Sequence, residues 1–264
     1  MPIWLYETRP LFAAIVIMIT IETISLIGLF LARRFLIRHF HASEGINDAI
    51  SGTVQAIGVF YGITVGLIAV AVWNTYSNAG DLVSREASAI GSMYRDVGGY
   101  PSPRREEMRS NLREYTVFLI DKAWPAQTRG HIPEGGGEIL DALQANLFSF
   151  EPATQGQAAI HAETIGAYNN LLEFRRLRVD AVESGLSDVM WAVIWAGAAI
   201  SIGVAYFFRI DDAKLHALLV ALMAGFLAIV IFMIVINDKP FYGSVSVSSD
   251  PYKLVLDRVI DRVK

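Results

Sequence analysis

Four long apolar runs constrain the fold of this chain more than any other feature of its sequence. They occupy residues 11–32, 53–73, 189–208 and 215–236, so each has 20 to 22 residues. A helix rises about 1.5 Å per residue, so each run would extend roughly 30 Å, the thickness of the hydrocarbon core of a bilayer. The chain is 53% hydrophobic, with only 18% charged residues. We therefore predict an all-α membrane protein with four transmembrane helices.

The polar middle of the chain lies between the second and third runs and also has a helical pattern. Apolar residues at spacings of three and four continue directly from the second run, at Ala79, Val83, Ala87, Ile90, Tyr94 and Val97. Gly98 and Gly99 end this pattern, and Ser102 offers a hydroxyl to cap the next helix. We predict four parts: a first transmembrane pair (1–73), an inserted helical bundle (74–188), a second pair (189–236), and a C-terminal extended segment with a short helix (237–264).

Composition and motifs argue against several classes of function. The chain has no cysteine, and its net charge of −4 does not favour a nucleic-acid partner. The sequence contains no HExxH, GxSxG or P-loop motif, and its five histidines form no metal-binding pattern. We expect no enzyme activity, no cofactor and no metal site.

The second run carries the most specific pattern. Gly58, Gly62 and Gly66 are four residues apart and form one smooth helix face, which favours close helix–helix packing in membranes. The opposite face includes Phe60 and Thr64. This face would contact lipid in a simple anchor, whereas in a ring of subunits it would line a pore.

The end of the same run carries a family resemblance. Trp73, Asn74, Tyr76 and Asn78 resemble the Trp-Asn-x-Tyr-x-Asn pattern that ends the second membrane helix of bestrophins. After the fourth run, Pro240, Phe241 and Gly243 resemble the Pro-Phe-Gly turn of the same family. The sequence is most similar to bacterial proteins with a bestrophin-like domain, and this likeness covers most of the chain.

The resemblance implies a homo-oligomeric channel for small monovalent ions, pentameric as in bestrophins, with the second helices lining a hydrophobic neck. Counted back from Trp73, the neck positions fall on Ala56, Phe60 and Thr64, and Leu67 and Ala71 extend the lining. Ala56 and Thr64 replace larger apolar residues of the family, so the choice between anions and cations stays open.

The resemblance also bears on calcium. In calcium-activated bestrophins an acidic run after the Pro-Phe-Gly turn helps to bind the ion, which needs six to eight oxygen ligands. Here that run is SVSVSSD, with Asp250 as its only carboxylate. We expect no activation by calcium. The segment would be either a structural plug, extended against a neighbouring subunit, or an ordinary exit loop.

Several charged residues allow two interpretations. Glu22, at the centre of the first run, either influences the ion path or is a protonated carboxyl bonded to a hydroxyl of Thr20, Ser25 or Thr64. One set of charges either rings an inner vestibule or forms helix-surface pairs: Asp81, Arg85, Glu86, Arg95 and Asp96. A basic set is expected at the membrane surface: Arg33, Arg34, Arg38, Arg175, Arg176 and Arg178.

Two membrane orientations remain open. The short loops between paired runs hold basic residues, so the positive-inside rule would place them in the cytoplasm. The resemblance instead implies a bacterial inner-membrane protein with the helical bundle and both termini in the cytoplasm, which we adopt. The alternative to a channel is a membrane-anchored sensor or scaffold whose helical domain binds a ligand or partner.

Overall fold

The computed structural model describes residues 4–36 and 45–263, and this part of the chain is helical with no β-strand. Arg38 lies outside the described residues. The chain divides into two compact units. We call residues 1–75 and 185–238 the membrane unit, and residues 76–184 and 239–264 the polar unit. Each is described by itself below.

Four helices of the structure are long and apolar enough to cross a membrane, as predicted. They are α2 (Pro10–Leu31), α3 (Ile46–Asp96), α8 (Asp188–Ala205) and α9 (Ala213–Asp238). A short α1 (Trp4–Glu7) precedes α2, and a π-helical turn (Ala32–Leu36) follows it. Because α3 continues to Asp96, it supplies residues to both units.

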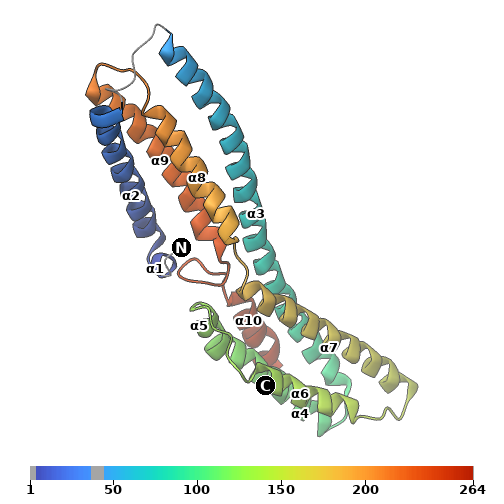
Figure 1. Ribbon diagram of the computed structural model, residues 1–264. Helices are drawn as coiled ribbons and strands as arrows, with labels where there is room; N and C mark the ends of the chain where they lie inside the picture. Colours follow the sequence, from blue (N-terminus) through green and yellow to red (C-terminus); the bar gives the residue numbers. More distant parts are fainter. Residues whose placement is uncertain (1–3, 37–44, 264) are drawn as a thin grey trace. The chain divides into compact units, whose positions relative to one another are not determined.

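Within the membrane unit, α2 packs along α9, and α8 packs on α9 (Figure 1). Polar groups close both ends of this arrangement. The carboxylate of Asp238 accepts a hydrogen bond from the Tyr6 hydroxyl at 3.1 Å and another from the Leu186 amide at 2.6 Å. Toward the other end of α9, the Arg33 guanidinium donates to the carbonyl of Ile210 at 3.0 Å and contacts His216 at 3.1 Å. Buried apolar side chains and these end contacts together hold the three helices.

The polar unit is built from the second part of α3 and from shorter helices. They are α4 (Arg104–Phe118), α5 (Trp124–Gln127), α6 (Gly136–Phe148), α7 (Gln155–Val182) and α10 (Asp250–Val255). A 3₁₀ turn (Val97–Gly99) ends α3, a π-helical turn (Leu119–Ala123) links α4 to α5, and the turns Leu256–Ile260 and Asp261–Val263 follow α10. The apolar stripe predicted on α3 is confirmed, since all six of its members are buried. The predicted cap at Ser102 is wrong, because Pro103 holds the N-cap position of α4 and no side chain caps it.

A buried ionic cluster lies inside the polar unit, and it corrects two predictions. Glu86, expected at a vestibule or a helix surface, is fully buried, and Arg178, expected at the membrane surface, is 2% exposed. Arg178 Nε lies 2.5 Å from Glu86 Oε2. The hydroxyls of Tyr115 and Tyr252 donate to the same carboxylate at 2.7 and 2.8 Å. The cluster therefore joins α3, α4, α7 and α10.

The surroundings of this cluster shift the pKa of its members. Burial, and then the Glu86 charge, raise the pKa of Tyr115 and of Tyr252 well above 10.0. Burial is the largest single influence on Arg178 and lowers its pKa, but the Glu86 charge, Tyr252, Tyr115 and the hydrogen bond to Glu86 together outweigh burial, so this pKa is raised overall. The cluster thus consists of one ion pair with two neutral hydroxyl donors.

The segment after α9 is a compact loop on the polar unit. The Val247 amide donates to the Pro240 carbonyl at 2.8 Å, and Gly243 turns the chain with φ +79°. Phe241 is 1% exposed and packs edge-on against Trp124, whose indole N–H donates to the Val247 carbonyl at 3.0 Å. These residues therefore form a loop of turns that is bound by its own chain, and the expected contact with a neighbouring subunit stays a prediction.

Candidate functional site

The part of α3 inside the membrane unit presents three different faces. At about 100° per residue, the first face carries all five predicted pore residues. Every one is exposed in the single chain: Ala56, Phe60, Thr64, Leu67 and Ala71. Phe60 is 73% exposed and Leu67 is 67% exposed. An apolar face this open on a single chain faces lipid on a simple anchor, or another chain or a central path in an oligomer.

The second face packs against α8. Val65, Ala69 and Val72 are buried there. Tyr61 is half-buried, and its hydroxyl donates to the Ile194 carbonyl at 2.8 Å. Its ring occupies the space above Gly197 that a side chain would need. The packed face and Phe60 lie on different sides of α3. Packing of this face therefore fixes the direction in which Phe60 points.

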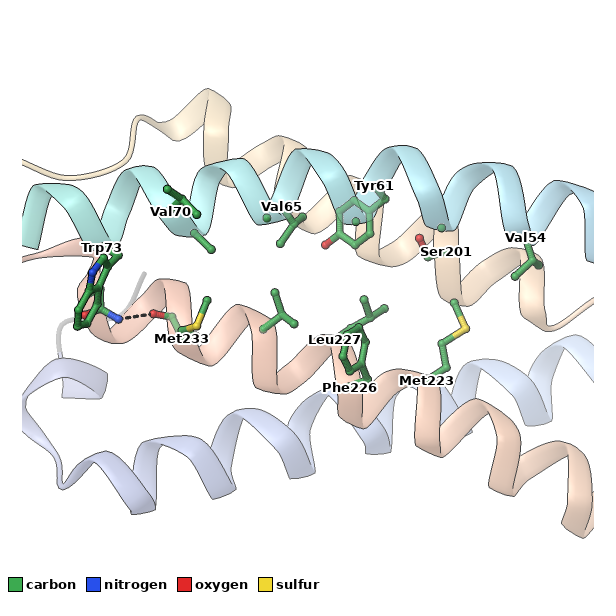
Figure 2. A pocket seen from close by; sticks show the side chains of 16 residues that line it. Val54, Tyr61, Val65, Val70, Trp73, Ser201, Met223, Phe226, Leu227 and Met233 are labelled. Carbon is green, nitrogen blue, oxygen red and sulfur yellow. Dashed lines mark hydrogen bonds between the residues drawn. The ribbon is translucent and has the colours of Figure 1, made fainter.

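The third face holds the three glycines and lines an open apolar groove. Figure 2 shows the groove between α3 and α9, with Ser201 of α8 at its side. Its volume is about 560 Å³, and Met223, Phe226 and Leu227 line the α9 wall. A Cβ added at Gly58, Gly62 or Gly66 would meet no atom within 4 Å. In the described part of the chain no helix packs closely on the glycines, so the predicted close approach stays a prediction about a second chain.

The hydroxyl of Thr64 has a local partner. It donates to the Phe60 carbonyl one turn earlier, at 2.8 Å. The hydroxyl proton is therefore engaged in a hydrogen bond within the helix, while the oxygen keeps lone pairs that can accept a hydrogen bond from outside it. Thr64 thus offers an acceptor on an otherwise apolar face.

Glu22 lies on α2 and packs against α9. Its Oε1 is 2.9 Å from the position that a Cβ at Gly225 would occupy, so the absence of a side chain there makes room for the carboxyl. None of the hydroxyls of Thr20, Ser25 and Thr64 is hydrogen-bonded to Glu22 in the structure, and those of Ser25 and Thr64 donate to the carbonyls of Ile21 and Phe60. In the described part of the chain Glu22 has no hydrogen-bond partner. Glu22 and the pore residues thus lie on different helices.

The residues that carry the family resemblance have different surroundings. Trp73, Asn74 and Asn78 are exposed, and Trp73 lines the glycine groove. In the polar unit, the Tyr76 hydroxyl donates to the Val245 carbonyl at 3.0 Å. Tyr76 therefore binds the loop that begins with Pro240, so the two sequence motifs meet in the structure.

The polar unit contains a groove of its own. Its volume is about 640 Å³, and it lies between the exposed polar side of α3 and α7. Asp81, Arg85 and Asp96, three of the five predicted vestibule residues, line it. Glu163 and Asn170 of α7 face them, and burial, followed by the charge of Glu163, raises the pKa of Asp96. The sequence did not reveal these α7 residues, because no spacing rule links them to α3.

Comparisons with known proteins agree with this architecture. The model of the Bestrophin-like domain family matches residues 19–252, and the chain belongs to this family. A mutant form of a bacterial bestrophin homologue from Klebsiella pneumoniae has the same fold, with a TM-score of 0.71, 10% identity, and coverage of 94% of this chain and 98% of that one. A second mutant of the Klebsiella homologue gives a TM-score of 0.67, 10% identity, and coverage of 92% and 98%. A structure described as a membrane protein gives 0.67, 11% identity, and coverage of 91% and 96%. No curated protein matches the sequence.

Proposed function

We propose that this chain forms a homo-oligomeric ion channel, with five subunits as the family resemblance implies, in which α3 of each subunit lines the pore. The exposed face of α3 carries the proposal, because the described part of the chain leaves its five residues uncovered: Ala56, Phe60, Thr64, Leu67 and Ala71. Lipid alone would cover such a face on a simple anchor. In a ring of subunits the same face would surround a central path.

The neck of the proposed pore is formed by Phe60. A ring of phenyl groups closes a path by dewetting, since an ion does not shed its water into an apolar constriction without compensating ligands. Thr64 lies one turn further along the helix, and its outward oxygen lone pairs would hold water there. Small monovalent ions are the permeant species, and the mixed apolar and hydroxyl lining leaves the choice of charge open.

Calcium has no role in opening the proposed channel. The carboxylate of Asp250 lies 3.0 Å from the Lys253 ammonium, which occupies part of its capacity to bind a cation. Among the described residues, no group of three His, Asp or Glu side chains gathers as a metal site. One carboxylate with a lysine beside it falls short of the charged oxygen ligands that calcium needs.

We also infer that the protein lies in the inner membrane of a bacterium, with the polar unit and both termini in the cytoplasm. The resemblance to bestrophins supports this orientation. In it, the polar side of α3, with Asp81, Arg85 and Ser88, would face an aqueous vestibule.

The direct test is a structure of the purified protein in lipid nanodiscs by electron cryomicroscopy. We expect five copies around a continuous central path, with Phe60 at its narrowest point. A subunit whose Phe60 contacts lipid on the outside of the assembly would contradict the proposal.

The second candidate is a membrane-anchored sensor or scaffold. The polar groove of about 640 Å³ between α3 and α7 favours it, because the groove has the size of a small-molecule site and holds groups of both charges. Under this hypothesis, replacing groove residues would change ligand binding while substitutions at Phe60 would have no effect.

A further inference from the structure

A small cavity in the polar unit is surrounded by arginines. Its volume is about 340 Å³, and six residues line it: Tyr94, Arg95, Arg109, Arg258, Val259 and Arg262. They come from the end of α3, from α4, and from the turns that follow α10. Four of the six are cations, and none is an acid. This concentration of positive charge stands out in a chain whose net charge is −4.

Arg109 is held in a fixed position at this cavity. Its guanidinium carbon lies 4.9 Å from the centre of the Tyr94 ring, within the range of a cation–π contact. Its Nη2 lies 2.9 Å from the position that a Cβ at Gly98 would occupy, so the glycine makes room for the guanidinium. Its Nε is buried and has no hydrogen-bond partner. A buried donor of this kind is costly to leave unpaired and is a natural ligand for an anion.

The nearby acids form no close ion pair with the four lining arginines in the described part of the chain, although the charge of Arg95 acts to lower the pKa of Asp96. Asp261 is bound by Arg113, a neighbour outside the cavity lining, at 3.0 Å. Asp96 follows Arg95 in sequence, and it lines the separate groove toward Glu163. Among the described residues, none of the four lining arginines has an ion pair within 4.0 Å. Like charges that converge without counter-charges repel one another, and an anion between them removes that repulsion.

We propose that this cavity binds a multivalent phosphate anion. The planar fork of arginine matches the oxygens of phosphate and donates two parallel hydrogen bonds, which a spherical halide does not use. Four guanidiniums provide more charge than a monovalent ion would balance, and the cavity is large enough for more than one phosphate group. A soluble polyphosphate and the headgroup of an anionic lipid share this chemistry. The cavity lies wholly within the polar unit, so the proposal does not depend on the pore.

The test uses the purified full-length oligomer and tripolyphosphate as the probe, titrated by calorimetry against sodium chloride of equal ionic strength. We expect one site per chain. Arg109→Gln should weaken binding by about tenfold or more, as expected for the loss of a charge-assisted hydrogen bond. The double variant Arg258→Gln/Arg262→Gln changes exposed side chains that pack little, so it tests the site even if Arg109→Gln folds poorly.

Two further variants separate a built site from general charge attraction. Gly98→Ala keeps every charge but displaces the Arg109 guanidinium, and it should weaken binding measurably, though less than Arg109→Gln does. Arg176→Gln removes one cation from an exposed position on α7, where the side chain is 84% exposed, and it should bind like the wild type.

A second arm identifies the source of the phosphate. Thermal stability is measured in nanodiscs of phosphatidylglycerol and of phosphatidylcholine. If tripolyphosphate does not bind, stabilisation by phosphatidylglycerol that is reduced in the Arg109 and Gly98 variants still supports the site, with a lipid headgroup as the ligand. Equal tripolyphosphate binding in Arg109→Gln and Arg176→Gln, or no response in either arm, would overturn the proposal.

Discussion

The ring of Tyr61 on α3 fills the space above Gly197 on α8. The hydroxyl of the same tyrosine reaches past this contact to the Ile194 carbonyl, one turn earlier on α8. The Tyr61 ring packs on a glycine, and the Tyr61 hydroxyl is hydrogen-bonded to the same helix. These two contacts fix the rotation of α3 about its own axis within the membrane unit. That rotation decides which residues the helix presents to a neighbour.

Two glycines of the membrane unit should therefore respond differently to substitution. In Gly197→Ala the new methyl group meets the Tyr61 ring, so we expect a lower melting temperature of the purified protein. In Gly62→Leu the new side chain enters the open groove, where no atom lies within 4 Å of the Cβ, so the single chain should keep its fold.

The expected effect of Gly62→Leu is on assembly, because a large side chain would block close approach by a second chain. Size-exclusion chromatography with light scattering in mild detergent measures this. A Gly62→Leu protein that keeps the oligomer mass and thermal stability of the wild type would show that the glycine face is no interface.

Replacing Phe60 should open the proposed neck. Phe60→Ala removes the phenyl ring from each subunit and should raise basal ion flux into liposomes while the oligomer stays intact. Thr64→Phe adds a second aromatic ring and should lower flux below that of the wild type. The assay is run with chloride and then with potassium as the permeant ion. Unchanged flux in both variants would show that the Phe60 face of α3 does not line a pore.

The buried pair of Glu86 and Arg178 should be sensitive to loss of one partner. Glu86→Gln leaves the Arg178 charge buried without a counter-charge, and breaking such a pair costs about 3–5 kcal/mol of unfolding free energy. The control is Asp180→Asn, which removes the exposed partner of Arg176 at 4.0 Å and should change stability little. Similar unfolding midpoints for the two variants would mean that the buried pair contributes no more than a surface pair.

Alkaline pH should destabilise the polar unit. The pKa of Tyr115 and of Tyr252 is raised in the folded state, whereas in the unfolded chain both titrate near 10. Below pH 10 both states keep these protons. Above it the unfolded state releases them first, so stability falls by about 1.4 kcal/mol per pH unit for each tyrosine. Unfolding midpoints between pH 8 and pH 11 should fall less steeply in Tyr115→Phe than in the wild type.

Micromolar calcium should not change ion flux through the reconstituted protein. Asp250 is the only carboxylate in the run that follows the Pro240 turn, and Lys253 lies beside it. The liposome assay with calcium buffered at several levels tests this expectation. A reproducible rise in current with calcium, abolished by Asp250→Asn, would contradict it.

Helical periodicity predicted the four apolar helices and the long extension of α3. The apolar stripe from Ala79 to Val97 was predicted correctly, because buried positions recur every three or four residues along a helix. Glu86 shows the limit of that rule. It lies three residues after Val83 and four before Ile90, on the same buried side, and this position was a signal that its charge needs a partner. Its partner Arg178 lies 92 residues further along the chain, and no local pattern connects the two.

The candidate site was predictable to a similar extent. Spacing alone separated the Phe60 face from the Gly62 face, since both follow from the angle per residue. The open groove at Gly62 was not predictable, because it depends on how α3 and α9 lie relative to one another and on the side chains of the α9 wall. Whether lipid or a second chain fills the groove cannot be read from helical periodicity.

The members of the buried cluster in the polar unit are synthesised at different stages of translation. Glu86, Tyr115 and Arg178 leave the ribosome before α8 and α9 are made, whereas Tyr252 follows both of these membrane helices. The carboxylate of Glu86 therefore lacks one of its donors until the last two transmembrane helices have been synthesised. The polar unit acquires its complete interior only after α8 and α9 have been synthesised, so errors in the membrane insertion of these two helices would appear as incomplete folding of the polar unit.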